Sequence, residues 1–265
     1  MGNLKILLIV LIVFSLGCGP KVVKLATTTS LQDTGLLDLL IDEFHKENYC
    51  KIQAIAIGSG QAIQLGKQGE VDILLVHSPS DEIEFMNQGY GSKRTTFMHN
   101  NFVILGPPND PAKVKGTKKL TDAFRKITNS NALFISRADN SGTYKKEKQL
   151  WSKAGVFPKN YIETGQGMSR TIWITNEKRG YTLSDKATYS VLKKTTDLII
   201  VYENDDVLIN PYSLILVNKD KSPKVNDEGA EKFMNFILSK KAKGIIENFG
   251  KQEHNQPLFS YDYQL

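Results

Sequence analysis

The chain has 265 residues, 40% of them hydrophobic, and a formal net charge of +6. This composition is typical of a soluble globular protein with one large or two small domains. A positive charge would suit a nucleic-acid-binding protein, but the lysines are scattered over 113–126, 145–159 and 219–243 without a pattern of interleaved base-stacking aromatics. We therefore expect no nucleic-acid partner, and a mild positive field that attracts small anions.

The N-terminus has the pattern of a secretory signal. Lys5 precedes an apolar run from Ile6 to Phe14, and Cys18 follows a short stretch of Ser, Leu and Gly. The run is too short to cross a bilayer as a permanent helix. Residues 1–18 are thus predicted to be a signal peptide with Cys18 as a lipobox cysteine, giving a membrane-anchored lipoprotein in the periplasm or at the cell surface. Since the residues before Cys18 depart from the usual lipobox, an ordinary cleaved signal is the alternative.

The rest of the chain alternates apolar strands with amphipathic helices, which is typical of an α/β protein with mainly parallel sheets. In chain order, the first part predicts strands at 22–26, 51–57, 71–76 and 102–105, and helices at 35–47, 61–68 and 81–88. Pro107-Pro108 indicates a break between two lobes. The second part predicts helices at 120–127, 142–153, 168–178, 229–238 and 241–248, and strands at 133–136, near 161, at 198–202 and at 212–217.

Segments rich in hydroxyl groups and glycine stand where predicted strands pass into helices. They are residues 26–30, 58–61, 77–80, 136–143 and 164–169. In an open α/β sheet, ligands bind beyond the carboxyl ends of the strands, so we expect these segments to face one crevice. Free N–H groups and the helix dipole favour an anion at such positions. Helix capping alone would explain any one segment, but 27–30 has more hydroxyls than a cap uses, and Arg137 adds a permanent cation that suits oxyanion oxygens.

In their order and spacing, these segments resemble tungstate-binding proteins of ABC transporters. The resemblance covers essentially the whole mature chain and is carried by 27–30, 58–63, 71–79, 136–143, 181–185 and 210–212. It implies an α/β protein with a type II periplasmic-binding-protein fold, in which two α/β lobes are joined by a two-segment hinge. The crossings are expected near 101–106 and 210–217, with residues 19–101 and 212–265 in lobe 1 and residues 102–211 in lobe 2.

The same resemblance implies a set of oxyanion-binding residues. In the first lobe they are Thr28, Thr29, Ser30, Ser59 and Gly60, and in the second they are Arg137, Ser141, Gly142 and Thr143. Arg170 is added as a second cationic candidate, with a surface ion pair as its alternative. Ala138 stands where relatives commonly have glycine, so we expect an ordinary backbone conformation there. Asp139 is expected to cap its turn, although as an acceptor it would favour phosphate instead.

The function implied is capture of tungstate, or of molybdate, between the lobes and delivery to the permease of an ABC importer, by a monomer. The oxyanion is the ligand, and no cofactor or metal cation is expected. Phosphate keeps a proton near neutral pH, so a site built only of donors excludes it. A phosphate- or sulfate-binding protein of the same fold, a sensory protein and an enzyme are the alternatives. The enzyme is disfavoured, because no pattern proposes a nucleophile with its base, a Walker lysine motif or metal-ligand spacing among the four histidines.

Overall fold

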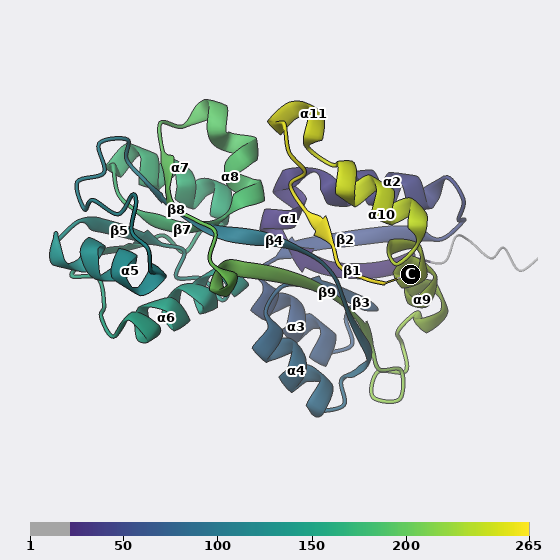
Figure 1. Cartoon of the computed structure of the whole chain (residues 1–265). Helices are drawn as coiled ribbons and strands as arrows, with labels where there is room; N and C mark the ends of the chain where they lie inside the picture. Colours follow the sequence, from purple (N-terminus) through teal and green to yellow (C-terminus); the bar gives the residue numbers. More distant parts are fainter. Residues whose placement is uncertain (1–21, 265) are drawn as a thin grey trace, which may run out of the picture.

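The computed structural model describes residues 22–264. The predicted signal segment 1–18 and Cys18 lie outside these residues, so both stay predictions. Within the described part of the chain, no helix has the length and apolar character needed to span a membrane. Two α/β lobes lie side by side in Figure 1, and the long strand β4 runs from one into the other.

The first lobe is built on a mixed sheet in which the strands follow the order β10-β4-β9-β3-β1-β2. Strand β1 pairs in parallel with β2 and β3, whereas β9 runs antiparallel between β3 and β4. The strands are β1 (Val22–Thr28), β2 (Lys51–Ile57), β3 (Ile73–Val76), β4 (Gly91–Gly106), β9 (Ile209–Val217) and β10 (Ser260–Tyr261).

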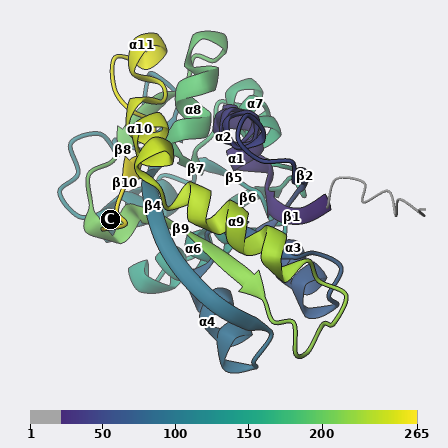
Figure 2. The same cartoon turned by 90° about the vertical axis from the view of Figure 1, so that its right-hand side faces the viewer.

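Helices cover both faces of this sheet, and each face has its own apolar core. Figure 2 shows α9 and α10 on one face and α4 on the opposite one. The first face carries α1 (Thr29–Thr34), α2 (Leu36–His45), α9 (Asp227–Ile237) and α10 (Lys240–Asn248), followed by the short α11 (Lys251–His254). The second face carries α3 (Ser59–Lys67) and α4 (Pro79–Asn87).

The second lobe uses the far end of β4, which pairs antiparallel with β7 and β8. Strand β5 pairs in parallel with β6, and one isolated bridge joins its Phe134 to Tyr181, the residue before β7. The strands of the second lobe, besides β4, are β5 (Leu133–Ser136), β6 (Asn160–Glu163), β7 (Thr182–Asp185) and β8 (Ile199–Tyr202). Its helices are α5 (Leu120–Asn129), α6 (Gly142–Ala154), α7 (Met168–Lys178) and α8 (Lys186–Leu192), with short 3-10 turns at Lys193–Thr195 and Asp206–Leu208.

The two lobes are joined where β4 changes partners. Asn101 pairs with Ile209 of β9 in the first sheet, and the next residue, Phe102, pairs with Asp185 of β7 in the second. The chain returns to the first lobe at the start of β9. This is the predicted two-lobed α/β fold with two crossing segments, while the limits 19–101, 102–211 and 212–265 stay a prediction.

Two predictions about the elements are wrong. Mainly parallel sheets were predicted, but β4 and β9 run antiparallel to their neighbours. The sequence did not show this, because a buried apolar run has the same pattern whichever direction the strand takes in the sheet. The helix expected at 35–47 is two helices, because Gly35 ends α1 in a left-handed conformation (φ 84°) before α2 begins. Thr29 therefore belongs to a helix whose N-cap is Thr28, and not to a loop.

Candidate functional site

The polar segments selected from the sequence meet at the boundary between the lobes. Thr28 and Ile57 are partners in β1 and β2, so both strands end at the same edge. From the second lobe, Gly167 approaches this edge: a Cβ built on it would stand 3.4 Å from Thr29 Oγ1. The N–H of Gly60 donates to the carbonyl of Asn140 across the boundary, at 3.0 Å. The ends of four helices, α1, α3, α6 and α7, thereby enclose one site.

Four hydroxyl groups in these segments are buried and have no hydrogen-bond partner in the protein. They belong to Thr27, Thr29 and Ser59 of the first lobe and Thr143 of the second. A buried hydroxyl without a partner costs about 1 to 3 kcal/mol, so native structures rarely contain one without a reason. Their gathering at helix N-termini indicates a place for an acceptor that the protein itself does not supply.

Arg137 brings a permanent positive charge to the same place. Its side chain is 3% exposed, and its Nη2 and Nε donate to Asp139 Oδ2 at 2.5 and 3.2 Å. Asp139 also accepts from Ser141 Oγ, at 2.5 Å. Both carboxylate oxygens of Asp139 are thus engaged by side chains of their own turn. The expected capping role is instead taken by Ser141, which is the N-cap of α6. The guanidinium retains Nη1 for a further acceptor.

The remaining predicted residues divide into those with available donors and those without. Gly142 and Thr143 open α6, and the first N–H groups of a helix have no partner inside it. Ser141 caps this helix, and its hydroxyl proton goes to Asp139, while its N–H donates to the carbonyl of Asp139. Gly60 gives its N–H to Asn140. The structure thus leaves Ser141 and Gly60 beside the site with their N–H donors occupied.

The other three candidates differ in burial. Thr28 and Ser30 are buried, with their hydroxyl oxygens 3.3 Å apart, and Thr28 Oγ1 accepts from Leu31 N as the cap of α1. Arg170, in contrast, is exposed on α7. The structure does not bring Arg170 into the buried cluster.

Comparisons with known proteins agree with this geometry. A family model described as "PBP superfamily domain" matches residues 19–241. The tungstate-binding protein TupA of Peptoclostridium acidaminophilum is 43% identical over 240 residues, which are 89% of this chain and 84% of that relative. This chain belongs to the TupA family of the PBP superfamily.

Solved structures of TupA-family proteins have the same fold. The tungstate ABC transporter structure from Geobacter sulfurreducens is 42% identical, with a TM-score of 0.79 over 86% of this chain and 98% of that one. The tungstate-binding protein TupA of Desulfovibrio alaskensis G20 is 42% identical, with a TM-score of 0.78 over 92% of this chain and all of that one. The predicted fold class and the resemblance to tungstate-binding proteins are both confirmed.

One expectation about the arginine loop of this TupA-family chain is wrong. Ala138 has φ 46°, a left-handed conformation, where an ordinary one was expected. For a residue with a Cβ this costs about 1 kcal/mol. The loop is held by neighbouring contacts, because Ala138 N donates to Ser136 Oγ at 3.2 Å and the Arg137 carbonyl accepts from Gly165 N at 2.8 Å. The glycine-like backbone is therefore kept without glycine.

Two groups at the site were not selected from the sequence. Thr27 lies in the same run of hydroxyls, but nothing local distinguishes its orphaned hydroxyl from that of Thr28, which is consumed in a cap. Asn140 acts through its backbone carbonyl, which any residue type would supply. Only the packing of the two lobes identifies them.

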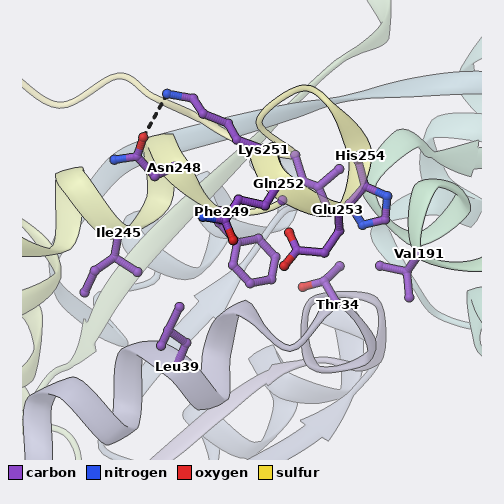
Figure 3. A pocket seen from close by; sticks show the side chains of 12 residues that line it. Thr34, Leu39, Val191, Ile245, Asn248, Phe249, Lys251, Gln252, Glu253 and His254 are labelled. Atoms are coloured by element: carbon purple, nitrogen blue, oxygen red, sulfur yellow. Dashed lines mark hydrogen bonds between the residues drawn. The ribbon is translucent and has the colours of Figure 1, made fainter.

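A cavity of about 800 Å³ lies outside the candidate oxyanion site (Figure 3). It is bordered by α1 and α2, by Val191 of α8 and by the segment from Ile245 to Leu258. Phe249 and Glu253 lie against it, and its polar side chains carry charges of both signs. This wall of mixed charge and apolar surface differs from the donor-rich surroundings of Arg137, so the cavity is not a second site of the same kind.

Proposed function

We propose that this chain binds tungstate between its two lobes and delivers it to the permease of an ABC importer. The observation that carries the proposal is the set of four buried hydroxyls without partners, drawn from both lobes, together with the buried Arg137. Relatives with about the same length carry names that state tungstate binding or a tungstate ABC transporter. The oxyanion is the ligand, and no cofactor takes part.

A fully ionised dianion fits this site better than a protonated one. Hydroxyls, helix N–H groups and a guanidinium can all donate, and each hydrogen bond to a charged group contributes about 1.5 to 3 kcal/mol. The carboxylate next to Arg137, Asp139, already accepts from Arg137 and Ser141. Phosphate would bring a proton that finds no free acceptor, so it is expected to be rejected.

The finer predictions belong to the same proposal. We infer that the chain acts as a monomeric binding protein without catalytic activity. We infer also that Cys18 anchors it through lipid outside the cytoplasmic membrane. The names of its relatives describe binding and transport, which supports the first inference.

Calorimetric titration of the chain from Gly19 onward with tungstate, molybdate, sulfate and phosphate in one buffer tests the proposal. Molybdate has the same charge and nearly the same size as tungstate, so we expect it to bind measurably. We expect its affinity to be lower than that of tungstate. Sulfate is smaller and is expected to bind poorly, and phosphate not at all. Binding of phosphate alone would transfer the protein to a phosphate-binding role, and binding of none of the four would refute an oxyanion carrier.

The two candidate arginines provide a matched pair of variants. Replacing the buried Arg137 by Ala removes donors and the positive charge, and should weaken tungstate binding by about 100-fold. Replacing the exposed Arg170 by Ala should change the dissociation constant by less than about twofold, as surface charges contribute little. Melting temperatures of both variants show whether the fold is intact. Equal losses in the two variants would contradict the assignment of Arg137 as the principal cation.

A further inference from the structure

Four buried polar side chains beside the oxyanion site form a continuous hydrogen-bond chain. His77 Nδ1 lies 2.9 Å from Asn210 Oδ1, Asn210 Nδ2 donates to Asn100 Oδ1 at 2.7 Å, and Asn100 Nδ2 donates to Asp185 Oδ1 at 3.3 Å. All four are at most 3% exposed. Polar side chains buried to this degree are retained only when their hydrogen bonds are satisfied.

The direction of every bond in the chain follows from its end at Asp185. Both oxygens of this carboxylate accept, from the N–H and from the hydroxyl of Thr188 as well as from Asn100. Asn100 must then present its amide nitrogen to Asp185 and its oxygen to Asn210, which presents its own oxygen to His77. His77 therefore donates through Nδ1.

The imidazole of His77 is neutral near pH 7. Burial, together with the positive charge of Arg137, lowers the pKa of His77 to about 4, although its bond to Asn210 and the charge of Asp139 oppose the shift. A neutral ring with its proton on Nδ1 matches the direction of the chain. The hydrogen-bond directions in the network therefore hold over the pH range in which the protein is expected to work.

This network crosses the hinge. Asn100 and Asn210 are direct partners in β4 and β9, two residues before β4 enters the second sheet at Phe102. Asp185 pairs with Phe102 in the second lobe, whereas His77 follows β3 in the first. Both crossing strands and both lobes are therefore connected through one chain of buried side chains.

His77 also touches the helix that opens onto the oxyanion site. A Cβ built on Gly142, the first residue of α6, would stand 2.5 Å from the His77 carbonyl oxygen and 3.0 Å from Nδ1. The imidazole also packs against the Tyr212 ring, with 4.8 Å between centroids. A cavity of about 110 Å³ beside these groups is bordered by His77, Gly142 and Asn210. The start of α6 thus rests on a residue that is itself held by the hinge.

We propose that His77 is a positioning residue that sets the closed angle between the lobes, and with it the size of the oxyanion site. When the lobes close, the start of α6 comes to rest against His77, whose place is fixed by Asn210 and Tyr212. Because Gly142 and Thr143 approach the ligand from the same helix turn, the stop at His77 determines how close their N–H groups come to an oxyanion. This inference rests on the proposed binding of tungstate.

Replacing His77 by Gln in the full chain tests the role, with His99→Gln as the matched control. His99 is in the same lobe, next to Asn100 on β4, but its Nδ1 bonds to Asp262 at 2.8 Å, away from the network. We expect His77→Gln to bind tungstate still, but with dissociation faster by about fivefold to tenfold, the effect of one hydrogen bond. Its ratio of tungstate to molybdate affinity should move toward one. Solution scattering of its tungstate-loaded form should give a larger radius of gyration than the native protein.

The control His99→Gln should match the native protein in all three measurements. If His77→Gln does not fold, Asn100→Ala interrupts the same chain from within the hinge and should shift the three measurements in the same direction. The inference would be overturned if a folded variant had the same tungstate dissociation rate, tungstate-to-molybdate affinity ratio and radius of gyration as the native protein. Tungstate binding by the native chain is measured first. If the native chain does not bind tungstate, the proposed function fails and the inference falls with it. If the native chain binds tungstate and His77→Gln binds it identically, only the inference fails.

Discussion

Glu147 is a buried carboxyl directly behind the arginine loop. Its Oε2 accepts from Ser136 Oγ at 2.8 Å and its Oε1 from the Tyr161 hydroxyl at 3.0 Å, while Ser136 Oγ accepts from Ala138 N. Burial raises the pKa of Glu147 to about 7, although these hydrogen bonds oppose the rise. The left-handed backbone at Ala138 is thus stabilised from behind by a group outside the predicted site.

The raised pKa predicts how stability depends on pH. The carboxyl ionises near pH 4.5 in the unfolded chain but near 7 in the folded one, so rising pH within this window favours the unfolded state. Relative to Glu147→Gln, the native free energy of unfolding should fall by about 3 kcal/mol between pH 4.5 and 7 and then level off. Urea unfolding at a series of pH values measures the difference. Parallel curves for the two proteins would contradict it.

The candidate site is formed by the N-terminal ends of helices from both lobes. The close approach of these ends explains the glycine at position 60. Gly60 lies in the first turn of α3, and a Cβ there would stand 2.6 Å from the carbonyl oxygen of Asn140 in the opposite lobe. This contact is between backbones, so a side chain cannot be accommodated by a rotamer change. Glycine at this position permits closure, although it is a poor helix former.

Replacing Gly60 by Ala should therefore separate stability from binding. Alanine favours the helix by up to about 1 kcal/mol, so the free energy of unfolding should stay the same or rise. Tungstate affinity should fall by at least about tenfold, because the lobes cannot close fully. Gly244→Ala is the control: Gly244 is also helical, and its Cβ would meet nothing within 4 Å. A Gly60→Ala protein with native affinity would show that this contact does not limit closure.

The structure as a whole is a closed arrangement of the two lobes. Besides the bond from Gly60 to Asn140, Ser169 Oγ donates to Asp33 Oδ2 at 2.5 Å, and Lys145 forms an ion pair with Asp81 across the boundary. The last two pairs are partly exposed and contribute little each. We therefore expect ligand binding to add to the free energy that favours closure.

Small-angle scattering should then detect closure on ligand binding. Tungstate is expected to reduce the radius of gyration of the native chain, because the proposed site would contact its oxygens from both lobes at once. The same concentration of phosphate should leave the scattering profile unchanged. Titration to saturation checks that the change follows occupancy. An identical profile with and without saturating tungstate would refute a mechanism in which the lobes close on the oxyanion.

Local patterns in the sequence predicted many of the elements in their order, but they missed β7, α8, β10 and the part of β4 before Phe102. The strands at 51–57 and 133–136 and the helix at 168–178 have the predicted bounds. Periodicity depends on residues close together in the chain, so it needs no knowledge of the tertiary structure. The same local signals placed hydroxyls and glycines at helix starts, and this narrowed the site to a few segments.

The allocation of individual donors could not be predicted in the same way. Ser141 and Thr143 look alike in sequence, yet one hydroxyl is given to Asp139 and the other is left without a partner. Arg137 is buried while Arg170 is exposed, although both follow a strand and precede or open a helix. The direction of β4 and its change of partner at Phe102 were likewise invisible. Hydrogen bonding and burial at these positions depend on atoms from distant parts of the chain, which only the packing of the two lobes brings together.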